Sequence, residues 1–360
     1  MAEKQRVIYA TSGWCIHDTR WFTALQDNGL DPIAVSVTDD LALLPEGSRA
    51  YQSAEDLRNG VDELLETQPI PILAGPLTTI TRHLMGANTR IVGLSWGWDL
   101  QPEAIGEEFD ADELAWVSDL DALIVDSIVT EQVAINLGLD PARISNIPWG
   151  IYVDLFTPDG PKADLSRWGV EPGDRVALSL RSHTPIHRTA DVIEAFARAL
   201  PHDPSLFLIM GGDGPLLDAN REIATRLGID HRVRFVGTLP EHDLPGLLRA
   251  AEAYVSATEV DGTSVTLLQA LACATPVIVS NIPGNLPWLH DECSSIFPVR
   301  DVDSLSRRLR DQQERSELKE ASLRHAAEVR NSVNWRANTS GIPALLMGAA
   351  PGVTFGKVIE

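Results

Sequence analysis

The sequence predicts an α/β protein of two doubly wound, Rossmann-like domains that face one another across a cleft. Its 360 residues are enough for about two domains. Hydrophobic residues make up 44% of the chain, which is enough for two buried cores. In both halves short apolar runs alternate with amphipathic helical stretches, a pattern typical of parallel strands joined by crossover helices.

The first half contains five apolar runs that we expect to form buried parallel strands, at residues 6–11, 31–37, 70–75, 90–95 and 122–127. Apolar residues at helical spacing predict helices at residues 20–30, 53–67 and 131–139. The passage 148–174 is rich in Pro, Gly and Asp and is expected to be the linker. We therefore expect a first domain over residues 1–150.

The second half repeats the pattern and is expected to form a domain over residues 151–335. Strands are predicted at residues 175–182, 205–212, 233–238, 253–258 and 275–281, and helices at 190–200, 216–228, 242–251 and 264–274. A charged helix over residues 303–330 is expected to close this domain. Residues 336–360 contain too many Gly and Pro to predict a helix, and we expect them to return to the first domain.

The charge of the chain is strongly acidic and uneven. The formal net charge is −22, and residues 1–150 hold 8 Lys and Arg against 24 Asp and Glu, a net of −16. This field repels nucleic acid and anionic lipid surfaces and favours a cationic partner for the first half.

Three scattered cysteines are too few for a disulfide framework or a zinc site. The N-terminus begins with a strand rather than a signal peptide, and no apolar run reaches the roughly 20 residues needed to span a bilayer. We expect a cytoplasmic protein with no membrane insertion. The sequence does not indicate its oligomeric state.

Ligands of open α/β sheets bind at the carboxyl ends of the strands, so the loops that follow the strands are candidates for the site. The loop before the helix at 264–274 contains Asp261, Gly262, Thr263 and Ser264. Glycine lets an anion approach the backbone, and the first amides of the helix with two hydroxyls can bind phosphate. The alternative is that Thr263 or Ser264 simply caps the helix.

Arg181 and Arg188 follow the first strand of the second half. Two guanidinium groups in one loop can clamp a diphosphate, and the alternative is that both are exposed solubilising residues. Glycines at 211–214 permit a close approach of the backbone, but such a cluster is also typical of an ordinary turn.

Several of these segments together resemble the GT-B glycosyltransferases of the large retaining family four, glycosyl transferases group 1. The donor-site element of that family is similar to DGTSVTLLQALACATPVIVSNIPGN, and its Gly-Arg…Lys-Gly…Glu-Ala-Phe stretch is similar to RSHTPIHRTADVIEAFARAL. The segments IPWGIYVDLFTP and SWGWDL resemble its interdomain motif and its Trp-Gly-Ser-Asp-Leu loop, and Trp335 fits the tryptophan before its final helix. The resemblance extends from about residue 7 to 340.

The resemblance implies a nucleotide diphosphate sugar donor, UDP- or GDP-linked, held by the second domain without a cofactor or a metal. Asp261 falls at the first acid of the Glu-x7-Glu motif, beside the donor sugar, and Gln269 falls at the second acid, which binds ribose hydroxyls. Arg181 matches the arginine on the diphosphate. The other positions implied to bind the donor are Gly13, Arg188, Val236, Gly237, Leu239, Gly262, Thr263 and Ser264.

Besides Gln269, the sequence departs from the family at three places. His187 or Arg188 stands where the family has a lysine, Trp96 stands where it often has a histidine, and Asp261 is one carbon shorter than the common Glu. Asp99 remains as a second candidate catalytic carboxylate. Because an amide oxygen accepts hydrogen bonds from a diol, we predict that Gln269→Glu keeps or tightens donor binding, and that Asp261→Ala removes transfer.

The acceptor is expected to enter from the first domain. Trp14, Trp98 and Trp149 lie in candidate cleft loops, where aromatic faces suit sugars or a cation, or where the rings simply pack. His17 is either a base for an acceptor hydroxyl or a cap for the following helix.

The predicted function is therefore a retaining transfer of a hexosyl unit from a nucleotide diphosphate sugar to a hydroxyl of a cationic small molecule or a glycan. Two alternatives remain. One is a nucleotide-sugar epimerase, which requires paired carboxylates near the sugar. The other is a non-catalytic GT-B partner of an active transferase, suggested by the Asp261 and Gln269 pair.

Overall fold

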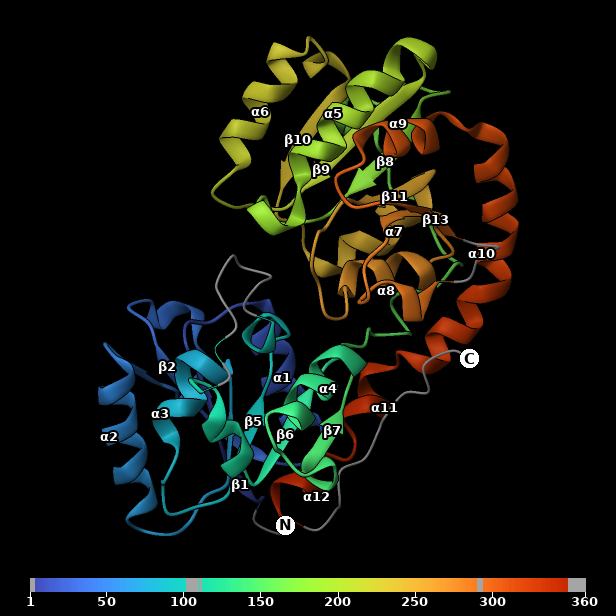
Figure 1. Cartoon of the computed structure of the whole chain (residues 1–360). Coiled ribbons are helices and arrows are strands. Elements are labelled where there is room, and N and C mark those ends of the chain that lie inside the picture. The colour runs from blue at the N-terminus through green and yellow to red at the C-terminus, as the bar shows by residue number, and fades with distance from the viewer. Residues whose placement is uncertain (1–3, 102–109, 111, 290–293, 349–360) are drawn as a thin grey trace. The chain divides into compact units, whose positions relative to one another are not determined.

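The computed structural model describes residues 4–101, 110, 112–289 and 294–348, and in this part of the chain two parallel β-sheets are each flanked by helices (Figure 1). The chain divides into two compact units. The first unit takes the chain up to Pro148 and again from Arg336, and the second runs from Trp149 to Trp335. The predicted class of two doubly wound α/β domains is confirmed.

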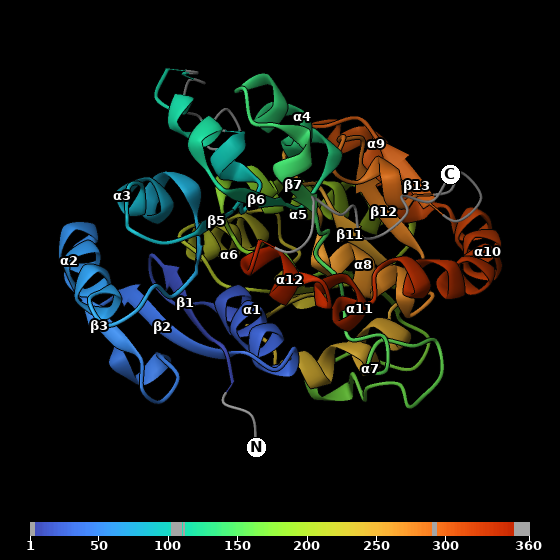
Figure 2. The same cartoon turned by 90° about the horizontal axis from the view of Figure 1, so that it is seen from below.

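Among the described residues, the first unit contains a seven-stranded parallel sheet in the order β3-β2-β1-β4-β5-β6-β7. Its strands are β1 (Arg6–Thr11), β2 (Asp31–Val37), β3 (Arg49–Tyr51), β4 (Ile72–Ala74), β5 (Ile91–Leu94), β6 (Ala122–Val125) and β7 (Ile144–Asn146). Figure 2 shows α1 and α12 on one face of this sheet and α2 and α3 on the other. The helices of this unit are α1 (Ile16–Asp27), α2 (Ala54–Leu65), α3 (Arg82–Leu84), α4 (Ile128–Asn136), α11 (Trp335–Thr339) and α12 (Ile342–Leu346).

In the described part of the second unit, a six-stranded parallel sheet follows the order β10-β9-β8-β11-β12-β13. Its strands are β8 (Arg175–Ser179), β9 (Leu206–Gly211), β10 (Val233–Gly237), β11 (Ala253–Ser256), β12 (Val277–Ser280) and β13 (Ser294–Phe297). Its helices are α5 (Thr189–Ala199), α6 (Leu217–Arg226), α7 (Leu244–Ala250), α8 (Val265–Ala272), α9 (Val302–Arg310) and α10 (Gln312–Ser332).

The core of the second unit lies on both faces of its sheet because successive strand residues point to opposite faces. On β8, Val176 and Leu178 belong to the cluster that includes Leu267 of α8. Ala177, between them, belongs to the cluster that includes Phe196 of α5. A near-continuous apolar strand is what burial on both faces requires, and this is why the strand could be predicted from its sequence.

Helix α1 begins earlier than predicted, at Ile16 rather than at residue 20. Asp18 accepts a hydrogen bond from the backbone N–H of Cys15 at 2.8 Å, which satisfies a donor at the first turn. The same carboxylate accepts a hydrogen bond from the Tyr9 hydroxyl at 2.9 Å and ties the helix to β1. Cysteine is an unusual residue at a helix start, so the sequence did not indicate that the helix begins directly after Cys15.

The charged helix predicted over residues 303–330 is two helices, α9 and α10, which are separated at Asp311. Asp311 has extended backbone (ψ 101°), so the helical path stops there. The short strands β3, β7 and β13 were not predicted, because their sequences RAY, ISN and SSIF lack an apolar run. The short helix α12 was not predicted either, although its Ile342 and Leu345 are buried.

The passage at the start of the predicted linker is packed rather than exposed. The indole of Trp149 stacks on that of Trp335 with ring centroids 5.8 Å apart, and Ile151 pairs with Asn334 as a parallel bridge. Gly150 lies between these contacts. A Cβ atom at Gly150 would lie 2.6 Å from the carbonyl oxygen of Val333 and 2.8 Å from the backbone nitrogen of Trp335.

We predict that Gly150→Ala destabilises the protein, because backbone atoms cannot move aside as a flexible side chain can. Overpacking of this kind costs roughly 1–3 kcal/mol. The free energy of unfolding should be measured by urea denaturation beside Ser332→Ala, whose exposed hydroxyl donates a hydrogen bond to the carbonyl oxygen of Glu328 in the same helix. An unchanged urea midpoint for Gly150→Ala would contradict the packing described above.

Candidate functional site

In the second sheet the order of the strands reverses between β8 and β11, which are hydrogen-bonded parallel neighbours (Figure 1). Chain connections lead away from this point toward opposite edges of the sheet, and ligands of doubly wound folds bind at such a point. Arg181 follows β8 by two residues, and Asp261 follows β11 by five. The topology therefore brings these two predicted site residues together from positions 80 residues apart.

Arg181 is the centre of the hydrogen bonding in this loop cluster. Its Nη2 donates to Oδ2 of Asp261 at 2.7 Å, and its Nη1 donates to the Ser264 hydroxyl at 2.8 Å. Burial lowers the pKa of Arg181, but Asp261 and then Tyr254 raise it, so that the pKa lies above its usual value. The guanidinium is a permanent cation that is only 11% exposed.

The Nε–H of Arg181 is buried and has no hydrogen-bond partner among the described residues. An unsatisfied buried donor costs free energy, roughly 1–3 kcal/mol and more when the group is charged. An anion that accepts from this N–H would remove that cost. The geometry therefore fits an anionic ligand better than it fits an exposed solubilising arginine.

Ser264 is at the N-cap position of α8, but its hydroxyl makes no capping bond to that helix. It accepts the hydrogen bond from Arg181 instead, so the simple capping role proposed for Ser264 is wrong. Thr263 and Ser264 are buried, with exposed fractions of 5% and 4%. The start of an eight-residue helix, with its positive end, lies beside the arginine cation.

Gly284 lies behind this loop and was not predicted as part of the site. A Cβ atom there would lie 2.1 Å from the carbonyl oxygen of Gly262 and 2.2 Å from that of Asp261. Only glycine permits this approach of two backbones. The turn after β12 thus determines where the Asp261 loop can lie, and the Pro-Gly-Asn sequence at 283–285 was the available signal.

Arg188 does not form the second half of an open diphosphate clamp. Its Nε and Nη2 donate to the two carboxylate oxygens of Asp191 at 2.7 and 3.0 Å, and its Nη1 lies 3.5 Å from Oε2 of Glu259. The prediction that it directly binds phosphate is therefore not supported, because two carboxylates balance its charge. Its backbone is left-handed (φ 45°), which turns the chain into α5.

His187 lies in the same loop as Arg181. Its Nδ1 lies 2.9 Å from the carbonyl oxygen of Ser182 and 2.9 Å from the hydroxyl of Thr184. Burial and the nearby Arg181 cation lower the pKa of His187 to about 3. The imidazole is therefore neutral near pH 7.

Gln269 and the end of β10 form the next part of this loop cluster. Gln269 is 3% exposed, and its Nε2 lies 3.5 Å from Oε1 of Glu241, a residue that the sequence did not single out. Val236 and Gly237 end β10, where the register shifts and Gly237 has a left-handed backbone (φ 69°). Leu239 follows and packs partly against the core cluster that contains α8.

Asp99 in the first unit is a structural carboxylate. It is 2% exposed, and it accepts hydrogen bonds from the Ser95 hydroxyl at 2.6 Å and from the backbone N–H groups of Leu77 and Trp96 at 2.8 and 3.0 Å. Burial raises its pKa, and these hydrogen bonds oppose the rise. The predicted catalytic role of Asp99 is not supported, because its oxygens are used in holding two loops together.

Trp149, like Arg188 and Asp99, does not lie as its predicted role requires. It was predicted to bind the acceptor, but it is 6% exposed and stacked on Trp335. Both residues belong to the second unit. The ring face that a sugar would need is covered by the neighbouring indole, so the alternative of ordinary packing applies.

The remaining candidates of the first unit gather after β1 and β5. Trp14 donates from Nε1 to Thr19 at 3.0 Å and meets the ring of Phe22 edge-on at 5.7 Å, so much of its surface packs within the unit. His17 meets Trp96 edge-on at 5.8 Å. Gly13 has a left-handed backbone (φ 93°) with open space at its Cβ position, and Trp98 is half-buried on the turn before Asp99.

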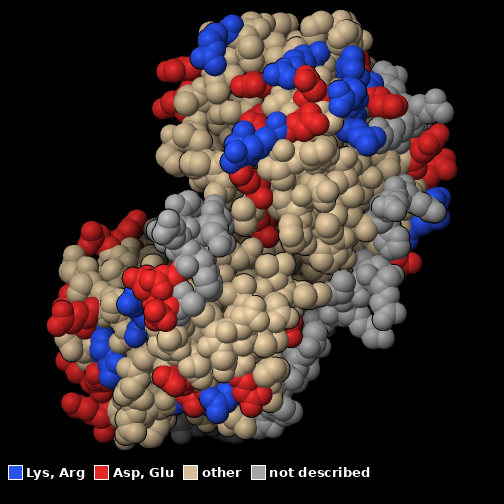
Figure 3. Space-filling view, viewed as in Figure 1, with Lys and Arg blue, Asp and Glu red and all other residues tan. Residues whose placement is uncertain are grey.

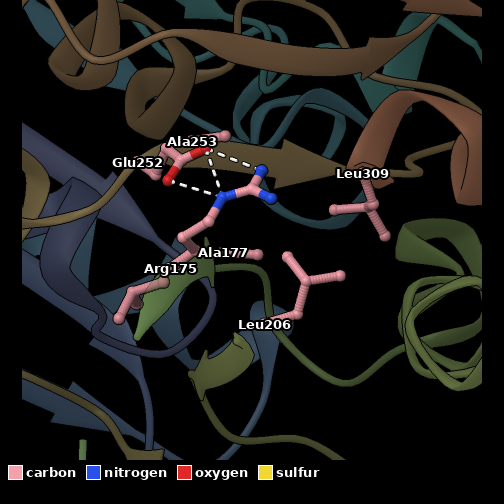
Figure 4. A pocket seen from close by; sticks show the side chains of 7 residues that line it. Arg175, Ala177, Leu206, Glu252, Ala253 and Leu309 are labelled. Atoms are coloured by element: carbon pink, nitrogen blue, oxygen red, sulfur yellow. Dashed lines mark hydrogen bonds and ion pairs between the residues drawn. The ribbon is translucent and has the colours of Figure 1, made fainter. Parts of the chain in front are cut away.

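A small cavity lies at the amino ends of the strands of the second sheet, away from the loop cluster around Arg181 (Figure 4). Arg175 opens β8 there and pairs with Asp203 and with Glu252, whose Oε1 lies 2.8 Å from its Nη2. The cavity volume of about 10 Å³ holds no more than one water molecule. These ion pairs join the amino ends of neighbouring strands, and the cavity is too small for a nucleotide or a sugar.

Residues 163–329 match the family described as Glycosyl transferases group 1. The D-inositol 3-phosphate glycosyltransferase of Frankia alni is 28% identical over 217 residues, which are 56% of this chain and 52% of the relative. The alpha-monoglucosyldiacylglycerol synthase of Streptococcus pneumoniae is 31% identical over 142 residues, which are 38% of this chain and 32% of the relative. The chain covers between 52% and 61% of the length of three curated relatives, all D-inositol 3-phosphate glycosyltransferases.

Two solved structures are similar over nearly the whole chain. HepE of Anabaena, solved with UDP and glucose, has a TM-score of 0.78 at 15% identity and covers 96% of this chain and 100% of its own. WaaG, a glycosyltransferase involved in lipopolysaccharide biosynthesis, has a TM-score of 0.74 at 14% identity, covering 95% and 100%. The predicted GT-B fold is confirmed by these likenesses.

We predict that His187 makes the protein less stable in mild acid. A histidine whose pKa is lowered on folding favours the unfolded state as pH falls from about 6.5 toward about 3, because only the unfolded chain then takes up the proton. In His187→Asn the side-chain amide can keep the bond to Ser182 without titrating. Urea midpoints at pH 7 and pH 5 should therefore differ less in His187→Asn than in the wild type, and an equal difference would contradict the lowered pKa.

Proposed function

We propose that this chain, whose residues 163–329 match the glycosyl transferases group 1 family, transfers a hexosyl unit from a nucleotide diphosphate sugar to an acceptor hydroxyl with retention of configuration. One observation carries the proposal. At the switch point of the second sheet, Arg181 is a buried cation with an unsatisfied Nε–H beside the start of α8. This combination suits a diphosphate, which carries negative charge in the ground state and gains more on leaving.

Arg181 and the start of α8 bind the diphosphate in this proposal. When the bond between the anomeric carbon and the phosphate oxygen breaks, negative charge grows on that oxygen. The guanidinium and the helix amides are already in place and stabilise this charge without rearrangement. No divalent cation is needed for that role in the proposed mechanism.

Asp261 lies next to the anomeric carbon in this proposal. Its Oδ2 is held by Arg181 at 2.7 Å, which fixes the carboxylate in one orientation. A fixed carboxylate stabilises positive charge that develops on the sugar ring as the leaving group departs. The acceptor oxygen bonds to the anomeric carbon on the same face, and its proton passes to the departing phosphate oxygen.

The acceptor in this proposal is a molecule that carries a hydroxyl, either a cationic small molecule, which we expect to be preferred, or a glycan. The net charge of −16 over residues 1–150 supports this, because it disfavours an anionic acceptor. On the face drawn in Figure 3, carboxylates predominate over the first unit, whereas basic and acidic side chains alternate on the second. Equal rates on amino and neutral acceptors at all salt concentrations would contradict the preference for a cation.

The epimerase alternative loses support from the position of Asp99. That reaction requires two carboxylates at the sugar, and Asp99 is buried with its oxygens used by Ser95, Leu77 and Trp96. Turnover of a donor sugar would distinguish a transferase from the non-catalytic alternative.

A thermal-shift screen tests the proposal directly. The melting temperature should be followed with UDP, GDP, ADP and dTDP and with their sugars, since a ligand that binds only the native state raises stability by RT ln(1 + [L]/Kd). We expect one nucleotide series to raise the melting temperature and its sugar to be consumed with an acceptor. Binding without turnover of any donor would favour the non-catalytic partner, and no binding at all would end the proposal.

We predict that Arg181→Lys weakens donor binding by about 10- to 100-fold. Lysine keeps the charge, but its donors all lie on one nitrogen and cannot replace the separated Nη1, Nη2 and Nε donors of the planar guanidinium. Each lost charge-assisted bond is worth roughly 1.5–3 kcal/mol. The matched control is Arg232→Lys, because Arg232 also pairs with a carboxylate, Asp174, at the opposite edge of the sheet. Calorimetric titration with the nucleoside diphosphate measures both, and equal losses in the two variants would contradict the role of Arg181.

We predict that Asp261→Asn abolishes transfer while it keeps or tightens nucleoside diphosphate binding. The substitution removes the charge next to the sugar, which should lower kcat by on the order of 100-fold or more. It also removes the counter-charge of Arg181, which then attracts phosphate more strongly. A kcat within a few-fold of the wild type, or a loss of diphosphate affinity equal to the loss of turnover, would contradict the assignment.

A further inference from the structure

Tyr254 carries a hydroxyl group into the core of the second unit. The residue lies on β11 with 0% of its surface exposed, and its ring belongs to the core cluster that contains Leu178 and Leu267. A buried hydroxyl costs free energy unless it has a hydrogen-bond partner. Its partner is the hydroxyl of Thr266, the second residue of α8, at 2.8 Å. The Tyr254 hydroxyl therefore reaches from the sheet to the first turn of α8.

The Thr266 hydroxyl lies beside the Arg181 guanidinium. Its Oγ1 is 3.5 Å from Nη1 of Arg181, and it is also 3.5 Å from the Ser264 hydroxyl. Ser264 accepts a hydrogen bond from the same Nη1 at 2.8 Å. Burial lowers the pKa of Arg181, whereas Asp261 and then Tyr254 raise it, which agrees with a tyrosine hydroxyl close to the cation. The hydroxyls of Ser264 and Thr266 thus lie at one nitrogen of the guanidinium, and Tyr254 supports them from the core.

The guanidinium of Arg181 is held through two of its three nitrogens. Nη1 lies at the two hydroxyls, Nη2 donates to Asp261 at 2.7 Å, and Nε is buried without a hydrogen-bond partner among the described residues. Because the group is planar, holding two nitrogens fixes the direction of the third N–H. A free arginine side chain loses rotamer freedom when it binds a ligand, so fixing it before the ligand arrives reduces the cost of binding.

We propose that Tyr254 is a positioning residue for the transfer: through Thr266 it holds the Arg181 guanidinium so that the Nε–H is presented to the diphosphate of the donor. The inference rests on the proposed function, because that function assigns Arg181 to the diphosphate. The alternative is a structural role, in which the bond to Thr266 only joins β11 to α8. Loss of the Tyr254 hydroxyl lowers stability in either case, so the test has to measure an effect that passes through Arg181.

A double-mutant cycle separates the two roles. Four proteins are compared: the wild type, Tyr254→Phe, Arg181→Lys, and the variant that carries both substitutions. Tyr254→Phe removes one oxygen atom and keeps the ring in the core. The probe is whichever of UDP, GDP, ADP and dTDP binds the wild type most tightly. Its affinity for each protein is measured by calorimetry, and each melting temperature is measured without ligand.

We expect Tyr254→Phe to weaken binding of the nucleoside diphosphate about 5- to 10-fold, as the loss of one hydrogen bond that orients the cation implies. In the Arg181→Lys background the same substitution should change the affinity by less than about 2-fold, because lysine has no planar fork for the hydroxyls to hold. Thr266→Val interrupts the contact at its other end and should behave like Tyr254→Phe in both backgrounds.

The matched control is Tyr9→Phe, because Tyr9 is also 0% exposed and its hydroxyl donates to Asp18 at 2.9 Å in the first unit. Its nucleotide affinity should match that of the wild type even where its melting temperature falls. Equal weakening by Tyr254→Phe in both backgrounds, or an unchanged affinity in folded Tyr254→Phe or Thr266→Val, would overturn the positioning role while leaving the transferase proposal in place. If no nucleoside diphosphate binds the wild type, both proposals fail.

Discussion

The ion pair between Arg181 and Asp261 is the interaction on which the candidate site depends. It joins the loops that follow β8 and β11, the two neighbouring strands at which the strand order of the second sheet reverses. Each partner determines the other: the carboxylate keeps the buried arginine charged, and the arginine holds the carboxylate in one orientation. Ser264 adds a hydroxyl contact to the same guanidinium, so the start of α8 is drawn into the arrangement.

Much of the fold could be predicted because its strands are buried on both faces. The predicted strands at 6–11 and 31–37 match β1 and β2 residue for residue. Short, continuous apolar runs of this length are typical of strands that are buried on both faces of a sheet. The strands that were missed are short and polar, as in the SSIF sequence of β13. Their pairing comes from neighbours that are distant in sequence, which local periodicity does not report.

In the candidate site, residues marked by their own loop could be predicted, whereas those whose role depends on partners distant in sequence could not. Arg181 and Asp261 could be identified because strand ends and glycine loops mark the ligand edge of such sheets. The buried Asp99 could not be distinguished in the sequence from a reactive carboxylate, since its partners Leu77 and Ser95 lie in two different loops. Glu241 was missed because nothing near it in sequence indicates the proximity of Gln269.

The chain passes from the first unit to the second after Pro148 and returns at Arg336, and this determines the order in which the two units are completed during translation. The second unit is an insertion within the first, whose sheet also receives α12: Arg90 beside β5 donates from Nε to the carbonyl oxygen of Leu345 at 3.1 Å. A ribosome synthesises α12 after the whole of the second unit. The inserted unit, whose two ends meet where Trp149 stacks on Trp335, therefore has all its residues first, and the unit that contains the N-terminus is the last to be completed.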